Sequence, residues 1–176
     1  MDIEELSGTL DVQNRPGISS VVHVAELPWI SAFGAFATNT NPGDEMRITG
    51  DHAFATGKGF VPWECEDDIS NLKIPVTGSK GSLGLKPELT VFMPGLTPAM
   101  LWSARQNKKF ILLVQPFGCN STAYIQLGDA CNPVRIMPSD GWNSGTAGGN
   151  DPRGMTVKLG SNYSVYFYEG ELTVYP

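Results

Sequence analysis

Apolar and polar residues alternate along several short stretches of the chain, which is the pattern of half-buried β-strands. Residues 18–27 show it first, just after a turn signal at 14–17. Residues 109–115 are apolar almost without interruption, which predicts a strand buried on both faces. Apolar residues at 83, 85, 89, 91 and 93 predict one long strand that is irregular at Pro87. Further strands are expected at 51–61, 122–127, 134–137, 155–159, 163–168 and 172–175.

A single helix is predicted in the middle of the chain. Thr97 is a favourable N-cap residue, Pro98 suits the first helical position, and residues 99–107 contain no Gly or Pro. At about 1.5 Å per residue, this helix is about 15 Å long and can only flank a sheet. Turn signals separate the other elements, at residues 41–44, 77–82, 93–96 and 151–154, with a Gly/Ser/Asn-rich loop at 140–150.

These elements predict a mainly β fold. Eight to ten short strands with frequent turns indicate a β-sandwich or barrel with one short flanking α-helix at about residues 97–107. No linker or repeat divides residues 1–176, so we expect a single β domain. Residues 28–50 have a weak pattern and a turn signature around Pro42, and are expected to form a long projecting loop or hairpin.

The number and sign of the charged residues restrict the possible functions of this β domain. Charged residues make up 17% of the 176 residues, below the usual ~25%, and the net charge is −6. The low charged fraction fits either a surface rich in Ser, Thr, Asn and Gly or a subunit buried against copies of itself. The acidic balance, with no basic patch, argues against general nucleic-acid binding. No apolar run approaches 18 residues and the N-terminus is acidic, so neither a transmembrane helix nor a signal peptide is expected.

The three cysteines are Cys65, Cys119 and Cys131, an odd number without a CxxC motif. They indicate neither a disulfide framework nor a zinc site. Reduced thiols in a protein made in the cytosol are the simplest interpretation, and a Cys119–Cys131 bridge is the alternative.

No constellation of residues in the sequence indicates catalysis. The two histidines are His23, in the middle of a predicted strand, and His52, whose neighbour Asp51 points to the opposite face if both lie on a strand. The motifs HExxH, GxSxG and the phosphate-binding loop are absent. Acidic residues at 64, 66, 67 and 68 lack the spacing of a calcium loop and read as a solvated loop. We therefore expect a non-enzymatic protein with no cofactor and no metal.

Exposed tryptophans offer the one ligand-binding alternative. Trp142 lies in the Gly/Ser/Asn-rich loop beside Asp140 and Asn143, where its ring could stack on a sugar. This arrangement keeps a carbohydrate-binding β-sandwich open as a second class of function, although a structural anchor for the loop is the simpler interpretation of Trp142.

The order of elements resembles that of tail tube proteins of tailed bacteriophages. The resemblance is carried by the helix at 97–107 leading into the strand at 109–115, by the turn-rich residues 140–154 before the strand at 155–159, and by the closing strands from 163 to 172. It extends over about two thirds of the chain and concerns architecture, since no specific motif is involved.

This resemblance implies a structural virion protein made in the cytoplasm of a host bacterium. Family members form hexameric rings that stack into a tube, and DNA passes through without specific binding. Their early long loop, here residues 34–50, contacts a neighbouring subunit. The contact residues expected in it are Phe36, Asn39, Asn41, Pro42 and Asp44. Partners are therefore further copies of the chain and other virion proteins, with no membrane; a capsid decoration or head–tail connector role is the alternative.

Overall fold

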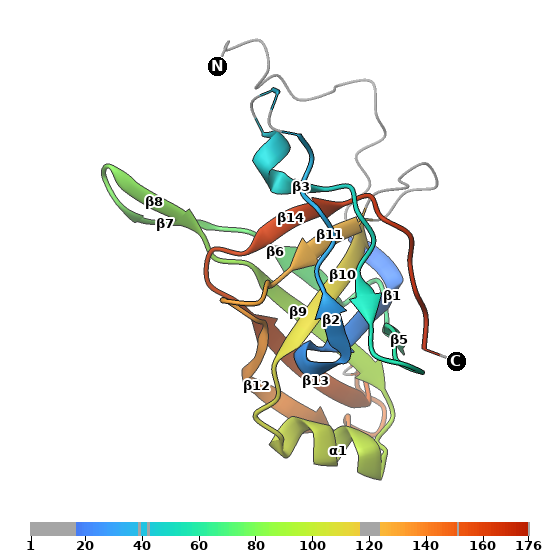
Figure 1. Ribbon diagram of the computed structural model, residues 1–176. Coiled ribbons are helices and arrows are strands. Elements are labelled where there is room, and N and C mark those ends of the chain that lie inside the picture. The colour runs from blue at the N-terminus through green and yellow to red at the C-terminus, as the bar shows by residue number, and fades with distance from the viewer. Residues whose placement is uncertain (1–16, 39, 42, 117–123, 151, 176) are drawn as a thin grey trace, which may run out of the picture.

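The computed structural model describes residues 17–38, 40–41, 43–116, 124–150 and 152–175. Within these residues the chain is mainly β, arranged as two facing sheets, two small ribbons and one α-helix (Figure 1). The expected fold class, mainly β with one short helix, is confirmed.

Strand pairing defines the architecture. The six-stranded sheet has the order β3 (Arg47–Ile48), β14 (Val165–Tyr168), β11 (Tyr124–Leu127), β10 (Phe110–Pro116), β1 (Ile18–Glu26) and β5 (Val61–Glu64). The four-stranded sheet has the order β12 (Arg135–Asn143), β13 (Gly154–Gly160), β9 (Glu88–Pro94) and β6 (Asn71–Lys73). The two ribbons pair β2 (Ile30–Ala32) with β4 (Ala53–Phe54), and β7 (Val76–Ser79) with β8 (Ser82–Leu85). Three-residue 3₁₀ helices are η2 (Leu27–Trp29) and η3 (Asp44–Met46), and the α-helix is α1 (Pro98–Arg105).

The main core lies between the two sheets. Val22 and Leu112 from the six-stranded sheet belong to the same buried cluster as Val91 and Leu159 from the four-stranded sheet. All four side chains are fully buried, and burial of each contributes about 1.5–3 kcal/mol. This cluster makes the two sheets a sandwich.

A second core lies on the other face of the six-stranded sheet. Ile111 and Leu113 of β10 point away from the first cluster and pack with Ile48, Phe60 and Tyr168. The strand β10 is therefore buried on both faces, as its uninterrupted apolar sequence predicts. The ribbon β2–β4 and the chain next to it form the cover over this face, in front of the sheet in Figure 1.

Helix α1 begins where the sequence indicates. The Thr97 side chain accepts a hydrogen bond from the backbone N–H of Met100 at 3.2 Å, and Pro98 occupies the first turn. The helix contains no fully buried residue, because only its Met100 and Ala104 side chains pack against the main core. Leu101 and Trp102 remain exposed at that end of the molecule.

Three expectations from the sequence differ in detail from the structure. The long strand expected at 83–93, irregular at Pro87, is interrupted at residues 86–87, and its first part, β8, pairs with β7 outside the two large sheets. Residues 140–143 are not loop but the end of β12, since pairing with β13 opposite Met155 and Gly154 overrides their turn propensity. The expected strand at 172–175 is reduced to a single parallel bridge between Val174 and Phe60.

Among the described residues, none of the helices has both the length and the apolar character needed to cross a bilayer.

Candidate functional site

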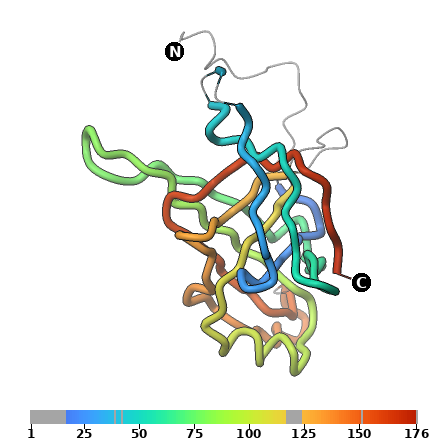
Figure 2. Tube along the Cα trace, viewed as in Figure 1, coloured from blue at the N-terminus to red at the C-terminus, as the bar shows by residue number. Residues whose placement is uncertain are grey.

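The segment at 35–49, called the projecting segment below, folds back on itself and stands above the six-stranded sheet (Figures 1 and 2). Phe36 bridges Ile48, and the N–H of Ala37 donates to the carbonyl of Arg47 at 2.9 Å. Just below, the N–H of Thr49 donates to the carbonyl of Ala35 at 3.0 Å. These contacts hold its two legs together in an antiparallel arrangement.

Two glycines at the base allow the legs to meet. A Cβ built on Gly34 would lie 2.0 Å from the carbonyl oxygen of Gly50, and one on Gly50 would lie 2.5 Å from the backbone nitrogen of Ala35. Neither position can hold a larger residue without moving backbone. The close crossing fixes where the projecting segment leaves the body.

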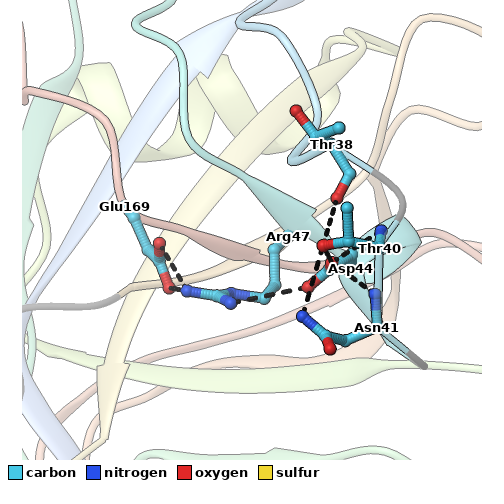
Figure 3. Close-up of polar contacts among 6 residues, drawn as sticks. All are labelled: Thr38, Thr40, Asn41, Asp44, Arg47 and Glu169. Carbon is cyan, nitrogen blue, oxygen red and sulfur yellow. Dashed lines mark hydrogen bonds and ion pairs between the residues drawn. The ribbon is translucent and has the colours of Figure 1, made fainter.

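A buried carboxylate organises the tip (Figure 3). Oδ2 of Asp44 accepts hydrogen bonds from the backbone N–H and the hydroxyl of Thr40, both at 3.1 Å, and from the N–H of Asn41 at 2.9 Å. The N–H of Asp44 donates in turn to the carbonyl of Asn41 at 3.2 Å, and Gly43 adopts a left-handed φ of 93°. The backbone N–H bonds from Asn41 and Thr40 are the main reason that the pKa of Asp44 is lowered. The tip is thus closed around an ionised side chain.

Arg47 connects the tip to the body. Its guanidinium makes a bidentate contact with Glu169, with Nη2 lying 2.8 Å from Oε1 and 3.0 Å from Oε2, and Nη1 lies 3.6 Å from Oδ1 of Asp44 (Figure 3). Glu169 follows β14 directly. In the parallel pairing of β3 with β14, Arg47 lies opposite Phe167 and the N–H of Glu169 donates to the carbonyl of Ile48 at 2.8 Å, so the ion pair lies beside this backbone hydrogen bond.

Below the base, His52 fills a buried polar position. Its Nδ1 accepts the backbone N–H of Gly34 at 2.9 Å, so the ring proton is on Nε2 and donates to Oε1 of Gln126 at 2.7 Å. The ring stacks on Tyr168 with centroids 4.6 Å apart. Burial lowers the pKa of His52, which keeps the ring neutral. Both ring nitrogens are occupied, so His52 is a structural link between the cover and the six-stranded sheet.

The expected contact residues have different positions in this geometry. The side chain of Phe36 is 50% exposed. Its ring makes an edge-to-face contact with the ring of Tyr166, and the two ring centroids are 5.3 Å apart. Asn41 is exposed, whereas Asp44 is buried and its Oδ2 is engaged within the tip. Asp44 therefore shapes the tip instead of presenting its charge to a partner. Asn39 and Pro42 lie outside the described residues, as does Cys119 of the proposed Cys119–Cys131 pair.

Sequence reasoning missed Arg47, Glu169 and Gln126. The ion pair joins residues 122 positions apart and the His52–Gln126 bond spans 74 positions, so no local spacing could reveal either. His52 itself was examined as a member of a dyad with Asp51. The structure separates the two: Asp51 accepts the backbone N–H of Glu171 at 2.6 Å.

One other polar cluster has residue types used in catalysis. Asp129 accepts hydrogen bonds from the hydroxyls of Ser164 at 2.6 Å and Tyr166 at 3.0 Å, and from the backbone N–H groups of Cys131 and Asn132, each at 2.7 Å. Burial and the Asp129 carboxylate raise the pKa of Tyr166 to about 12. Ser164 donates to a carboxylate and no histidine accompanies it, so this arrangement ties a turn to β14 and does not activate a nucleophile.

The remaining candidates give no clear ligand site. Within the described ranges, no group of three or more His, Cys, Asp and Glu side chains is placed to hold a metal ion. Trp142 is 39% exposed on β12, and Asn143 accepts the N–H of Gly145 at 3.0 Å, which fixes the turn that follows. Comparison of the chain with protein-family models, curated proteins and solved structures finds no significant match.

Proposed function

We propose that this chain is a self-assembling structural subunit, a non-enzymatic virion protein of the bacteriophage tail tube type. The observation that carries the proposal is the projecting segment. It holds its shape through its own hydrogen bonds, through Asp44 and through the Arg47–Glu169 pair, and it presents an exposed aromatic ring, Phe36.

A braced projection suits a contact between subunits. Binding by a flexible loop loses conformational entropy, whereas a loop that already has its bound shape loses little. Aromatic side chains supply much of the binding energy at protein interfaces. An exposed Phe36 on a fixed support therefore favours docking against another protein surface over a role as a passive connection.

The charge of the chain supports a conduit for DNA. Each copy contributes a net charge of −6, so a ring of copies is strongly acidic. An acidic wall repels phosphate groups and keeps the nucleic acid from adhering while it passes. The proposal thus includes passage of DNA without specific binding, and stacked rings of identical subunits, six to a ring.

Deleting residues 40–44 tests the proposal. The deletion removes the tip and leaves the crossing at Gly34 and Gly50 in place, so we expect a folded monomer that no longer polymerises. Circular dichroism reports the fold, while light scattering and negative-stain microscopy across concentration report rings or tubes. Deletion of residues 145–149, an exposed turn elsewhere, is the matched control and should still polymerise. Unchanged polymerisation without residues 40–44 would contradict the proposal that the projecting segment contacts a neighbouring subunit.

Two alternatives have distinct outcomes in the same experiments. A capsid decoration or head–tail connector protein would stay monomeric or form one ring, and would bind purified capsids. A carbohydrate-binding module is favoured only by Trp142, which is partly exposed. It would bind glycans on an array, and Trp142→Ala would abolish that binding while polymerisation stayed intact.

A further inference from the structure

The hairpin formed by β7 and β8 extends away from the sandwich (Figures 1 and 2). Among the described residues these two strands pair only with each other. In the register, Val76 lies opposite Leu85 and Gly78 opposite Leu83. Residues directly opposite in a sheet share a face, so Val76, Leu83 and Leu85 lie on the same face of the hairpin. That face is apolar.

The two faces of the hairpin differ in what covers them. The other face carries Thr77, Ser79, Ser82 and Gly84, and the ring of Tyr163 packs on it, because a Cβ on Gly84 would lie 1.9 Å from that ring. Only Leu85, at the base, reaches the main core.

Beyond the base, the apolar side chains have no cover. Val76 is 63% exposed and Leu83 is 68% exposed. A two-stranded hairpin alone is marginally stable in water, and neighbouring exposed apolar side chains on one face of it are the kind of surface that a partner can cover.

The charge of the hairpin restricts its partner. No Asp or Glu occurs between Asp68 and Glu88, whereas Lys73, Lys80 and Lys86 do. Lys80 stands exposed at the turn of the hairpin. A surface that accepts the hairpin should therefore combine an apolar depression with acidic groups at its rim.

The chain itself has such a surface. A groove of about 420 Å³ lies between α1, β5 and β9, and its apolar lining includes Trp63, Met93, Met100, Ile136 and Val157. Its rim on the β5 side is acidic: Glu64 lines the groove, and Glu66 and Asp67 line the depression that adjoins it. No ion pair among the described residues neutralises these three carboxylates.

The hairpin cannot fill the groove of its own chain. In Figure 1 the hairpin extends from the upper left of the molecule, whereas α1 lies at the bottom, with the sandwich between them. The surface that meets the hairpin must belong to another molecule.

We propose that the hairpin of one copy docks its apolar face into the groove beside α1 of a second copy, with Lys80 facing the acidic rim. This inference rests on the proposed function, self-assembly, and names a contact for it other than the projecting segment. The two surfaces differ, so the contact is head-to-tail. Repeated, it yields a closed ring or an open filament.

Charge exchange tests the contact directly. Lys80→Glu and Glu64→Lys each place like charges across it, so each variant alone should assemble roughly tenfold or more weakly than the natural chain. A mixture of the two variants restores opposite charges at every contact between a Lys80→Glu hairpin and a Glu64→Lys groove, and should assemble again. Sedimentation velocity across concentration measures each case.

A second substitution tests the apolar face. Leu83→Asp should leave the fold intact by circular dichroism and weaken assembly roughly tenfold or more. Val174→Asp, which changes another half-exposed apolar residue far along the chain, is the matched control and should assemble normally.

The outcomes separate this inference from the proposed function. Normal assembly of Leu83→Asp would overturn the docking of the hairpin and leave self-assembly standing. Loss of assembly in both charge variants without rescue in the mixture would overturn the groove as its partner. A natural chain that stays monomeric at all concentrations would overturn self-assembly and this contact together.

Discussion

The molecule has two projections, and they are built in opposite ways. The projecting segment at 35–49 is closed by polar contacts of its own, around Asp44 and through Arg47 to Glu169. The β7–β8 hairpin has regular backbone pairing, yet it leaves Val76 and Leu83 uncovered. The first makes its polar contacts within the chain, whereas the apolar side chains of the second would be buried only by a partner of the kind proposed above. If the chain self-assembles, it therefore uses a rigid contact surface and an incompletely buried one.

The largest effect is expected when the same change, Leu to Asp, is compared at a buried and at an exposed position. Leu112→Asp puts an unpaired charge into the fully buried strand β10, and we expect a loss of more than about 4 kcal/mol, enough to prevent folding. Leu83→Asp makes the same change on the exposed face of the hairpin and should alter stability by less than about 0.5 kcal/mol. Circular dichroism and urea unfolding measure both. A native-like Leu112→Asp protein would show that β10 is not the shared centre of the two cores.

The next test removes one bond of the support under the projecting segment. Gln126→Leu keeps the approximate volume but leaves the Nε2–H of His52 buried without an acceptor, at a cost of about 1–3 kcal/mol. The midpoint of urea unfolding reports the loss. Gln106→Leu, just after α1, is the control and should stay within about 0.5 kcal/mol of the natural chain. Equal effects in the two variants would mean that the polar network contributes nothing.

The third test uses pH. Burial lowers the pKa of both His52 and His23 in the folded protein below the ordinary value near 6.5. Below pH 6.5 the unfolded chain therefore binds protons that the folded chain does not, and stability falls as the pH falls. Urea midpoints at pH 7.5 and 5.5 should differ in that direction, and His52→Gln should reduce the difference. A midpoint that rises toward pH 5.5 would contradict the neutral state of these rings.

The smallest effect on stability is expected at the ion pair. Arg47 and Glu169 are both partly exposed, so Arg47→Ala should cost less than about 1 kcal/mol. We nevertheless expect weaker polymerisation, because the tip loses its tie to β14. Arg153→Ala is the control for removal of a surface charge. If the two variants polymerise equally well, the braced shape of the projecting segment is not required for assembly.

Local signals in the sequence were sufficient for the parts of the fold that depend on neighbours. Thr97 and Pro98 mark the start of α1, and the apolar run of β10 indicates burial on both faces. The alternation of apolar residues did not predict the environment of Leu83. Leu83 continues the apolar pattern of Leu85 and Leu89, but β8 lies outside the sandwich to which β9 belongs, so the side chain of Leu83 is exposed to water. A periodic pattern identifies a face without identifying what covers it.

The candidate site was less predictable for a related reason. A turn signature located the tip of the projecting segment, and it correctly required a left-handed residue at Gly43. The roles of its side chains depend on distant partners: Arg47 on Glu169, and His52 on Gln126. Asp44 was expected as a contact residue from the resemblance to tail tube proteins, whereas the structure buries its side chain within the tip.

The dependence of the projecting segment on residues much later in the sequence has a consequence during synthesis. Its support includes Gln126, Tyr168 and Glu169, so the segment can take its final shape only after residue 169 has been translated. At about 5–20 residues per second, the interval between Arg47 and Glu169 lasts on the order of ten seconds. A nascent chain therefore lacks the finished projection until Glu169 has been synthesised.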